Sequence, residues 1–174
     1  MILVTGATGN AGGAVVRALV DADEQVRGLI RRDADRSRLP TGAEGVTGDL
    51  NRPQTLRAAL AGTRAAFLLS GYQDLPATLA LMRTAGVERV VLLSSSAAPD
   101  GDLSNAVARY HILSERAVRE SGLPSTFLRP NSLMSNTFQW VPQLRDGTWS
   151  GRRSPACGSR CLTPTISVSS RPRR

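Results

Sequence analysis

The sequence contains no lysine: all 22 positively charged residues among its 174 are arginine. Cysteine is nearly as scarce, since only Cys157 and Cys161 occur, and two thiols are too few for a structural zinc site. No stretch approaches the roughly 20 apolar residues of a membrane-spanning helix, and no basic leader precedes the apolar start. These absences lead us to expect a cytoplasmic protein with no metal site, no signal peptide and no membrane partner.

The net charge of +8 is concentrated near the C-terminus. Residues 151–174 hold six arginines and no acid, which leaves the first 150 residues with a net charge of only +2. Residues 150–174 are rich in Ser, Arg, Pro and Gly without an apolar period, so we predict a disordered tail after a domain spanning 1–149. The tail is either a nucleic-acid-binding arm or a segment read out of its original frame. We favour the second reading, so nucleic acid is not an expected partner.

The first dozen residues organise the chain. Ile2 to Thr5 form an apolar, β-branched run typical of a buried strand, and glycines follow at positions 6, 9 and 12 before a helical pattern begins. In such a unit Gly6 allows a tight turn, Gly9 lets the backbone approach a pyrophosphate, and Gly12 lets the helix lie close to the sheet. The helix start offers free N–H groups and the positive end of its dipole to phosphates. The pattern predicts a dinucleotide site, and its alternative is a glycine-rich turn without a ligand.

Strands and helices then alternate along the chain. Further strands are expected at 25–30, 44–47, 65–69, 89–93 and 126–128, with helices at 12–22, 75–85 and 105–121 and a shorter one around Leu56 to Leu60, capped by Asn51. In the longest helix, Val107, Tyr110 and Ala117 share a face with Leu113 or Ser114, and we expect Tyr110 to pack on the sheet. The pattern predicts an α/β, Rossmann-like, doubly wound parallel sheet in the order 3-2-1-4-5-6, with helices on both faces.

The choice of coenzyme depends on the end of the second predicted strand. An acid there would accept hydrogen bonds from the adenosine ribose, whereas this chain has Arg31 and Arg32. Guanidinium groups suit a 2′-phosphate in charge and geometry, so the sequence favours NADP(H) over NAD(H). The alternative is an exposed arginine pair on a solvated loop.

Four segments, 5–12, 48–50, 111–115 and 121–131, together resemble the NmrA-like atypical short-chain dehydrogenase/reductases. Within that family, residues 1–149 look closest to the bacterial NAD(P)H:quinone oxidoreductase-like and triphenylmethane reductase-like members. Family members continue for on the order of a hundred residues further, a size typical of a small extra lobe, so the resemblance implies a chain truncated at its C-terminus.

The resemblance also implies site residues. The pyrophosphate would be held by Gly6, Thr8, Gly9, Asn10, Ala11 and Gly12. Arg31 would take the 2′-phosphate, and Asp49 and Leu50 would flank the adenine. The adenosine side would be lined by Leu69, Ser70 and Gly71, the nicotinamide side by Ser94, Ser95, Pro130 and Asn131, and the substrate pocket would begin at Asn136.

One departure from the wider superfamily limits the chemistry. Most of its reductases use a Tyr-x-x-x-Lys pair, but Tyr110 is followed four residues later by Ser114, and no lysine exists to replace it. His111, the only histidine, is either a proton donor or cofactor-orienting group beside the nicotinamide, or a helix-surface residue without a role. Ser94 and Ser95 either contact the nicotinamide or form a polar strand end exposed to water.

Three functions follow. The first is an NADPH-dependent oxidoreductase that passes hydride to a small quinone-like or aromatic acceptor, which asks little acid–base help from the protein. The second is a non-catalytic NADP(H)-sensing regulator that acts through a protein partner. The third is a truncated, inactive remnant. A homodimer is compatible with each of them.

Overall fold

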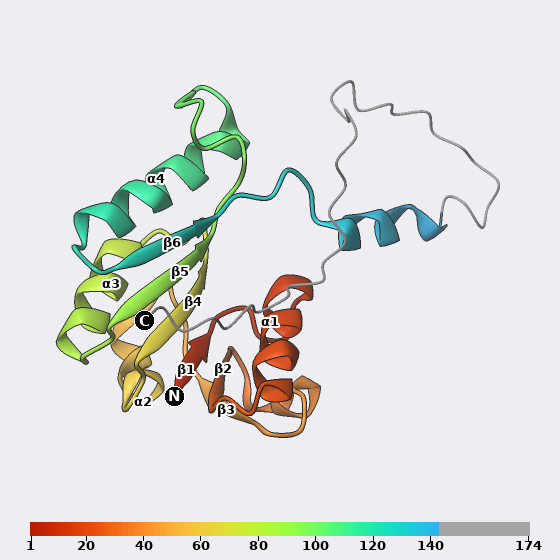
Figure 1. The fold of residues 1–174 in the computed structure, drawn as a ribbon, viewed down its shortest axis with the longest axis vertical. Helices are drawn as coiled ribbons and strands as arrows, with labels where there is room; N and C mark the ends of the chain where they lie inside the picture. Colours follow the sequence, from red (N-terminus) through yellow and green to blue (C-terminus); the bar gives the residue numbers. More distant parts are fainter. Residues whose placement is uncertain (143–174) are drawn as a thin grey trace, which may run out of the picture. The chain divides into compact units, whose positions relative to one another are not determined.

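A six-stranded parallel sheet forms the centre of the protein (Figure 1). The computed structural model describes residues 1–142. The strands are β1 (Ile2–Val4), β2 (Val26–Ile30), β3 (Ala43–Thr47), β4 (Ala65–Leu69), β5 (Arg89–Leu93) and β6 (Ser125–Leu128). They lie in the order β3-β2-β1-β4-β5-β6 with every pairing parallel, which confirms the predicted topology.

Helices cover both faces of the sheet. Helix α1 (Asn10–Asp21) packs on one face, and α2 (Arg57–Leu60), α3 (Leu75–Thr84) and α4 (Ala106–Glu120) lie on the other (Figure 1). Short 3₁₀ helices follow β2 (η1, Asp33–Arg38) and precede α2 (η2, Pro53–Leu56). The strand order reverses between β1 and β4, and in such sheets a ligand binds beyond the carboxyl ends of the strands at that point.

Alternating strand residues divide the core into two layers. Val4, Val26 and Phe67 face α1 and pack with its Val16, whereas Leu3 and its counterparts in β4 and β5 face the other helices. The helix-rich side holds the larger cluster, with Leu56, Leu60, Leu68, Leu75, Leu79, Met82 and Leu92 at most 2 % exposed. Burying each such side chain contributes roughly 1.5–3 kcal/mol, so this layer fixes the sheet against α2 and α3.

The described residues fall into two units. Met1–Arg129 form the first compact unit, and the second begins at Pro130. Its described part, 130–142, contains the 3₁₀ helix η3 (Met134–Trp140), in which the Thr137 hydroxyl donates to the Met134 carbonyl at 2.7 Å. The predicted domain boundary at 149 and the predicted disordered tail lie outside the described residues and stay predictions.

The orientation of α4 corrects one expectation. Tyr110 and Leu113 are 41 % and 43 % exposed, and Val107 is more exposed still, so Tyr110 does not pack on the sheet as expected. Of the predicted face only Ser114 and Ala117 pack inward, and the helix also buries Ala108, Glu115 and Val118. Periodicity locates an apolar stripe but does not fix which side docks; here Glu115 is buried because several donors neutralise it.

The expected Asn51 cap is also wrong. The residue before η2 is Arg52, and Pro53 occupies the first turn, where its missing N–H is no loss. The backbone N–H of Asn51 instead donates to Asp49 Oδ1 at 2.9 Å, which closes a turn after β3.

Across residues 1–142, no helix combines the length and apolar character needed to cross a bilayer.

Candidate dinucleotide-binding site

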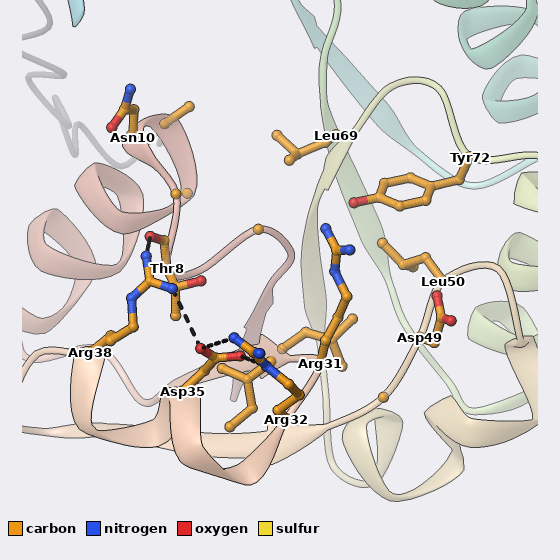
Figure 2. A pocket seen from close by; sticks show the side chains of 17 residues that line it. Thr8, Asn10, Arg31, Arg32, Asp35, Arg38, Asp49, Leu50, Leu69 and Tyr72 are labelled. Carbon is orange, nitrogen blue, oxygen red and sulfur yellow. Dashed lines mark hydrogen bonds and ion pairs between the residues drawn. The ribbon is translucent and has the colours of Figure 1, made fainter. Parts of the chain in front are cut away.

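A cleft of about 680 Å³ opens at the carboxyl ends of β1, β2 and β4 (Figure 2). Its walls come from the glycine turn, the end of β2 with η1, and the loops after β3 and β4. The predicted cofactor residues that line it are Gly6, Thr8, Gly9, Asn10, Ala11, Gly12, Arg31, Asp49, Leu50 and Leu69. The cleft also includes Arg32, which the sequence analysis named beside Arg31 for the 2′-phosphate. It further includes six residues that the sequence analysis did not assign: Leu29, Ile30, Asp35, Arg38, Gly48 and Tyr72.

The glycine turn is sterically required. Gly6 has φ +60°, a conformation that favours glycine, and it directly follows the fully buried Thr5. A Cβ on Gly12 would lie 2.6 Å from Gly6 C and 2.7 Å from Thr5 O, so no side chain fits there. The Thr5 hydroxyl accepts a hydrogen bond from Leu69 N–H at 3.2 Å, which joins the turn to the end of β4.

The start of α1 presents unused donors to the cleft. Its N-cap is Gly9, which has no side chain to cap the first turn, and that turn holds no acid. The N–H groups of Asn10, Ala11 and Gly12 therefore have no partner inside the helix. Free amides, the positive end of the dipole and a glycine-rich wall together fit the pyrophosphate of a dinucleotide.

The opposite wall is formed by Arg31, Asp49, Leu50 and Tyr72 (Figure 2). Burial raises the pKa of the Tyr72 phenol, an effect that the Asp49 charge adds to and the Arg31 charge opposes. A neutral aromatic ring opposite an apolar leucine suits a flat adenine base. The only signal for Tyr72 in the sequence is its place just after the strand end at Ser70-Gly71.

A second group of charges, of which the sequence indicated only Arg32, lies between the end of β2 and the glycine turn. Arg32 forms two hydrogen bonds of 3.2 Å with Asp35, and Arg38 Nη1 lies 3.4 Å from Asp35 Oδ1. Arg38 Nη2 donates to the Thr8 carbonyl at 3.1 Å. These bonds lower the pKa of Asp35, with the hydrogen bond from Arg32 as the largest cause.

Two residues predicted for the adenosine side lie outside the cleft lining. The Ser70 hydroxyl donates to the Leu93 carbonyl at 2.8 Å, and Gly71 N–H donates to Ser114 Oγ at 3.1 Å. Gly71 lines a different groove of about 400 Å³, which it shares with Tyr72, Tyr110, Leu113 and other residues of α3 and α4. Tyr72 therefore stands between the groove and the cleft.

The buried carboxylate of Glu115, a residue of α4, lies at the carboxyl ends of β5 and β6. Glu115 accepts hydrogen bonds from Ser94 Oγ at 2.6 Å, from Arg119 at 2.7 Å, and from Arg129 at 2.8 and 2.7 Å. These bonds, led by those from Arg129, lower its pKa from 4.5 to about 2 against the opposing effect of burial. The Ser94 hydroxyl proton is thus engaged by Glu115, and Ser95 Oγ accepts from Ala97 N–H at 3.3 Å.

His111 lies one turn before Glu115. Its ring is 4.1 Å from the Tyr110 ring, and its Nδ1 is buried without a hydrogen-bond partner among residues 1–142. Burial lowers the pKa of the imidazole, while the Glu115 charge opposes that shift. The imidazole therefore favours its neutral form, and one of its ring nitrogens is buried without a partner in the described part of the chain.

Pro130, Asn131 and Asn136 belong to the unit that begins at Pro130. Asn136 N–H donates to the carbonyl of Leu133, the residue before η3, at 2.9 Å. Their predicted roles at the nicotinamide and the substrate stay predictions.

A parallel sheet in this order, with a glycine turn, free helix amides and arginines around a cleft, defines a Rossmann-type dinucleotide-binding protein. Comparison with known sequences agrees: the chain belongs to the NAD(P)H-binding family, whose pattern it matches over residues 6–150.

Its relatives include several reductases. A (4-alkanoyl-5-oxo-2,5-dihydrofuran-3-yl)methyl phosphate reductase of Streptomyces griseus is 40 % identical over 83 % of this chain and 52 % of its own length. An NAD(P)H azoreductase of Xenophilus azovorans is 33 % identical over 84 % of this chain and 53 % of its own. The chain thus spans about half the length of these relatives.

Solved structures of reductases are also similar to this chain. The Citrobacter triphenylmethane reductase complexed with NADP(H) has a TM-score of 0.70 at 29 % identity, covering 84 % of this chain and 54 % of its own. The Escherichia coli quinone oxidoreductase QOR2 complexed with NADPH has a TM-score of 0.71 at 25 % identity, covering 84 % and 55 %. The resemblance stated from the sequence motifs is confirmed.

Proposed function

We propose that this chain supplies the coenzyme-binding cleft of an NADPH-dependent reductase that reduces a quinone-like or aromatic acceptor. The observation that carries the proposal is the cleft itself, where a glycine-rich turn, a helix start and three arginines surround one space. The relatives named as reductases support the direction of the chemistry.

Each wall of the cleft receives a part of the coenzyme in this proposal. The glycine turn and the first amides of α1 hold the pyrophosphate, and Leu50, Leu69 and Tyr72 flank the adenine. Arginine side chains at the end of β2 favour the 2′-phosphate of NADP(H) over the bare ribose of NAD(H). Two relatives were solved with NADP(H) or NADPH, which is consistent with this preference.

The bound coenzyme supplies the hydride, so the protein mainly positions the acceptor and excludes water. Burial lowers the pKa of the His111 imidazole, so in this proposal His111 orients the nicotinamide half of the coenzyme rather than donating a proton. In this proposal Ser94, Ser95, Pro130 and Asn131 approach the nicotinamide half, and Asn136 begins the acceptor pocket. Ser70 and Gly71 stay predictions for the adenosine side. The proton that completes quinone reduction comes from solvent.

The test is to mix the full chain with NADPH and a simple benzoquinone and follow the loss of nicotinamide absorbance. We expect turnover above the non-enzymatic rate. Gly12→Ala should reduce this turnover, and Glu120→Gln, on the surface of α4, should leave it unchanged. Absence of NADPH binding in calorimetry would overturn the proposal.

A coenzyme sensor is the second candidate. The exposed stripe of Tyr110 and Leu113 on α4 is compatible with a partner surface, a second copy of the chain included. Tight binding of NADPH and NADP⁺ without turnover of any quinone would favour this function over the reductase.

A further inference from the structure

The three arginines of the cleft are held in two different ways. Arg31 has no ion pair among residues 1–142, and Figure 2 shows its side chain extending toward Tyr72 and Leu50. Arg32 and Arg38 converge instead on one carboxylate, that of Asp35, from opposite ends of η1. Arg38 also bonds the Thr8 carbonyl, which brings the pair against the glycine turn.

Asp35 anchors this pair from below the surface. Its side chain is 13 % exposed, whereas those of Arg32 and Arg38 are 76 % and 58 % exposed. Both carboxylate oxygens are used, since Oδ2 accepts from Arg32 Nε and Oδ1 accepts from Arg32 Nη2 and Arg38 Nη1. Asp35 is therefore not presented to the hydroxyl groups of a ribose, although an acid in this region of a Rossmann fold can serve that purpose.

The guanidinium groups, by contrast, keep donors free. Arg32 does not use Nη1 and Arg38 does not use Nε in any bond within the described part of the chain. Two cations on one carboxylate leave a net positive charge at the wall, and a planar guanidinium recognises phosphate oxygens with high geometric specificity.

We infer that Asp35 is a positioning residue for coenzyme selectivity, which holds Arg32 and Arg38 where they recognise the 2′-phosphate on the adenosine ribose of NADP(H). The inference rests on the proposed binding of NADP(H) in this cleft. It assigns the phosphate to a pair at the end of β2, whereas the pyrophosphate faces the free amides of α1. It also moves the phosphate-binding role from Arg31, which lies on the adenine side, to Arg32 and Arg38.

The experiment measures dissociation constants of the full chain for NADPH and NADH by calorimetry. Asp35→Ala is expected to weaken NADPH binding about 10- to 100-fold, the range for lost hydrogen bonds to a charged group, and to change NADH binding less than about twofold. Asp33→Ala is the matched control, because Asp33 also lies in η1 but pairs with Arg36 at an exposed position outside the cleft lining. It should leave both constants unchanged.

Arg32→Gln and Arg38→Gln change exposed side chains and provide a second route if Asp35→Ala unfolds. Each should lower affinity for NADPH alone, and Asp35→Ala should add little to Arg32→Gln/Arg38→Gln, because it acts through these arginines. Asp35→Glu should restore part of the NADPH preference.

The outcomes distinguish a failure of this inference from a failure of the proposed function. If the wild-type chain prefers NADPH and the Asp35 and arginine variants keep that preference while Arg31→Ala abolishes it, the inference is wrong and the proposed function stands. An equal loss of NADPH and NADH affinity in Asp35→Ala shows a structural role only and overturns it too. If the wild-type chain binds both coenzymes equally, the proposed NADP(H) preference fails, and the inference fails with it.

Discussion

Replacing Glu115 by Gln gives the sharpest test of the network that joins α4 to β5 and β6. The side chain is 3 % exposed and accepts hydrogen bonds from Ser94, Arg119 and Arg129. Glutamine keeps the shape but loses the charge and one acceptor oxygen, so two guanidinium groups lose their counter-ion. Arg119 and Arg129 are 54 % and 35 % exposed and regain water in part. We therefore expect a loss on the order of 2 kcal/mol in the free energy of unfolding at pH 7.

The pH dependence provides an independent measure of the same interaction. The pKa of Glu115 is about 2 in the folded protein, down from an ordinary 4.5, so between these values the unfolded chain binds more protons. The stabilisation is fully present above pH 4.5 and is lost as the pH falls toward 2. Hence the difference between wild type and Glu115→Gln should be constant from pH 5 to 7 and should shrink below pH 4.5.

The assay is urea unfolding of the full chain followed by circular dichroism at a series of pH values. Glu120→Gln is the control, because Glu120 lies at the exposed end of the same helix. It should change the free energy of unfolding by less than about 0.5 kcal/mol. A Glu115→Gln protein as stable as Glu120→Gln at pH 7, or one whose deficit does not depend on pH, would refute this account of the network.

Three further changes test other parts of the structure. Gly12→Ala should cost about 1–3 kcal/mol of stability and abolish coenzyme binding, because the added Cβ meets backbone atoms of the glycine turn. Thermal melting measures the stability and calorimetry the binding, and intact binding would contradict the prediction. Arg27→Met should cost about 1–3 kcal/mol, because the half-buried guanidinium donates to Ala59 and Ala61 carbonyls at the end of α2 at 2.9 and 2.7 Å. Arg64→Met, at an exposed pair, should change stability by under about 0.5 kcal/mol, and equal urea midpoints for the two variants would refute the distinction. Tyr72→Leu should weaken NADPH and NADH equally, in keeping with the roughly 1–3 kcal/mol that aromatic stacking gives a base, and a selective effect on one coenzyme would contradict this role.

The parts of the fold that local patterns control could be predicted from the sequence. The glycine turn lies within a dozen residues of its strand and helix, so spacing alone determined its conformation. The strand order followed from the alternation of strands and helices, because right-handed crossovers leave few topologies. The Glu115–Arg119 pair was also predictable from its i,i+4 spacing, although the burial of Glu115 was not.

Contacts between loops could not be predicted in this way. Asp35 and Arg38 reach the cleft only because η1 turns back toward Thr8, and nothing in the residues after Arg32 specifies that direction. Tyr72 lies near Leu50 because the loops that hold them approach each other, and no repeating pattern in the sequence indicates this approach. The outward orientation of Tyr110 depends on the arginines that neutralise Glu115, and one of them, Arg129, comes from the end of β6.

Binding and turnover should therefore be separable in this chain. Every residue that lines the cleft lies between Gly6 and Tyr72, so the groups that we propose for the adenosine bisphosphate half of the coenzyme come from one compact unit. The residues expected at the nicotinamide and the substrate lie later, at 94–136. Adenosine 2′,5′-bisphosphate should consequently bind almost as tightly as NADPH, within about tenfold, and should compete with it for one site. A bisphosphate that binds a thousandfold more weakly would show that the nicotinamide half carries most of the affinity, and the later residues would then belong to the binding site itself.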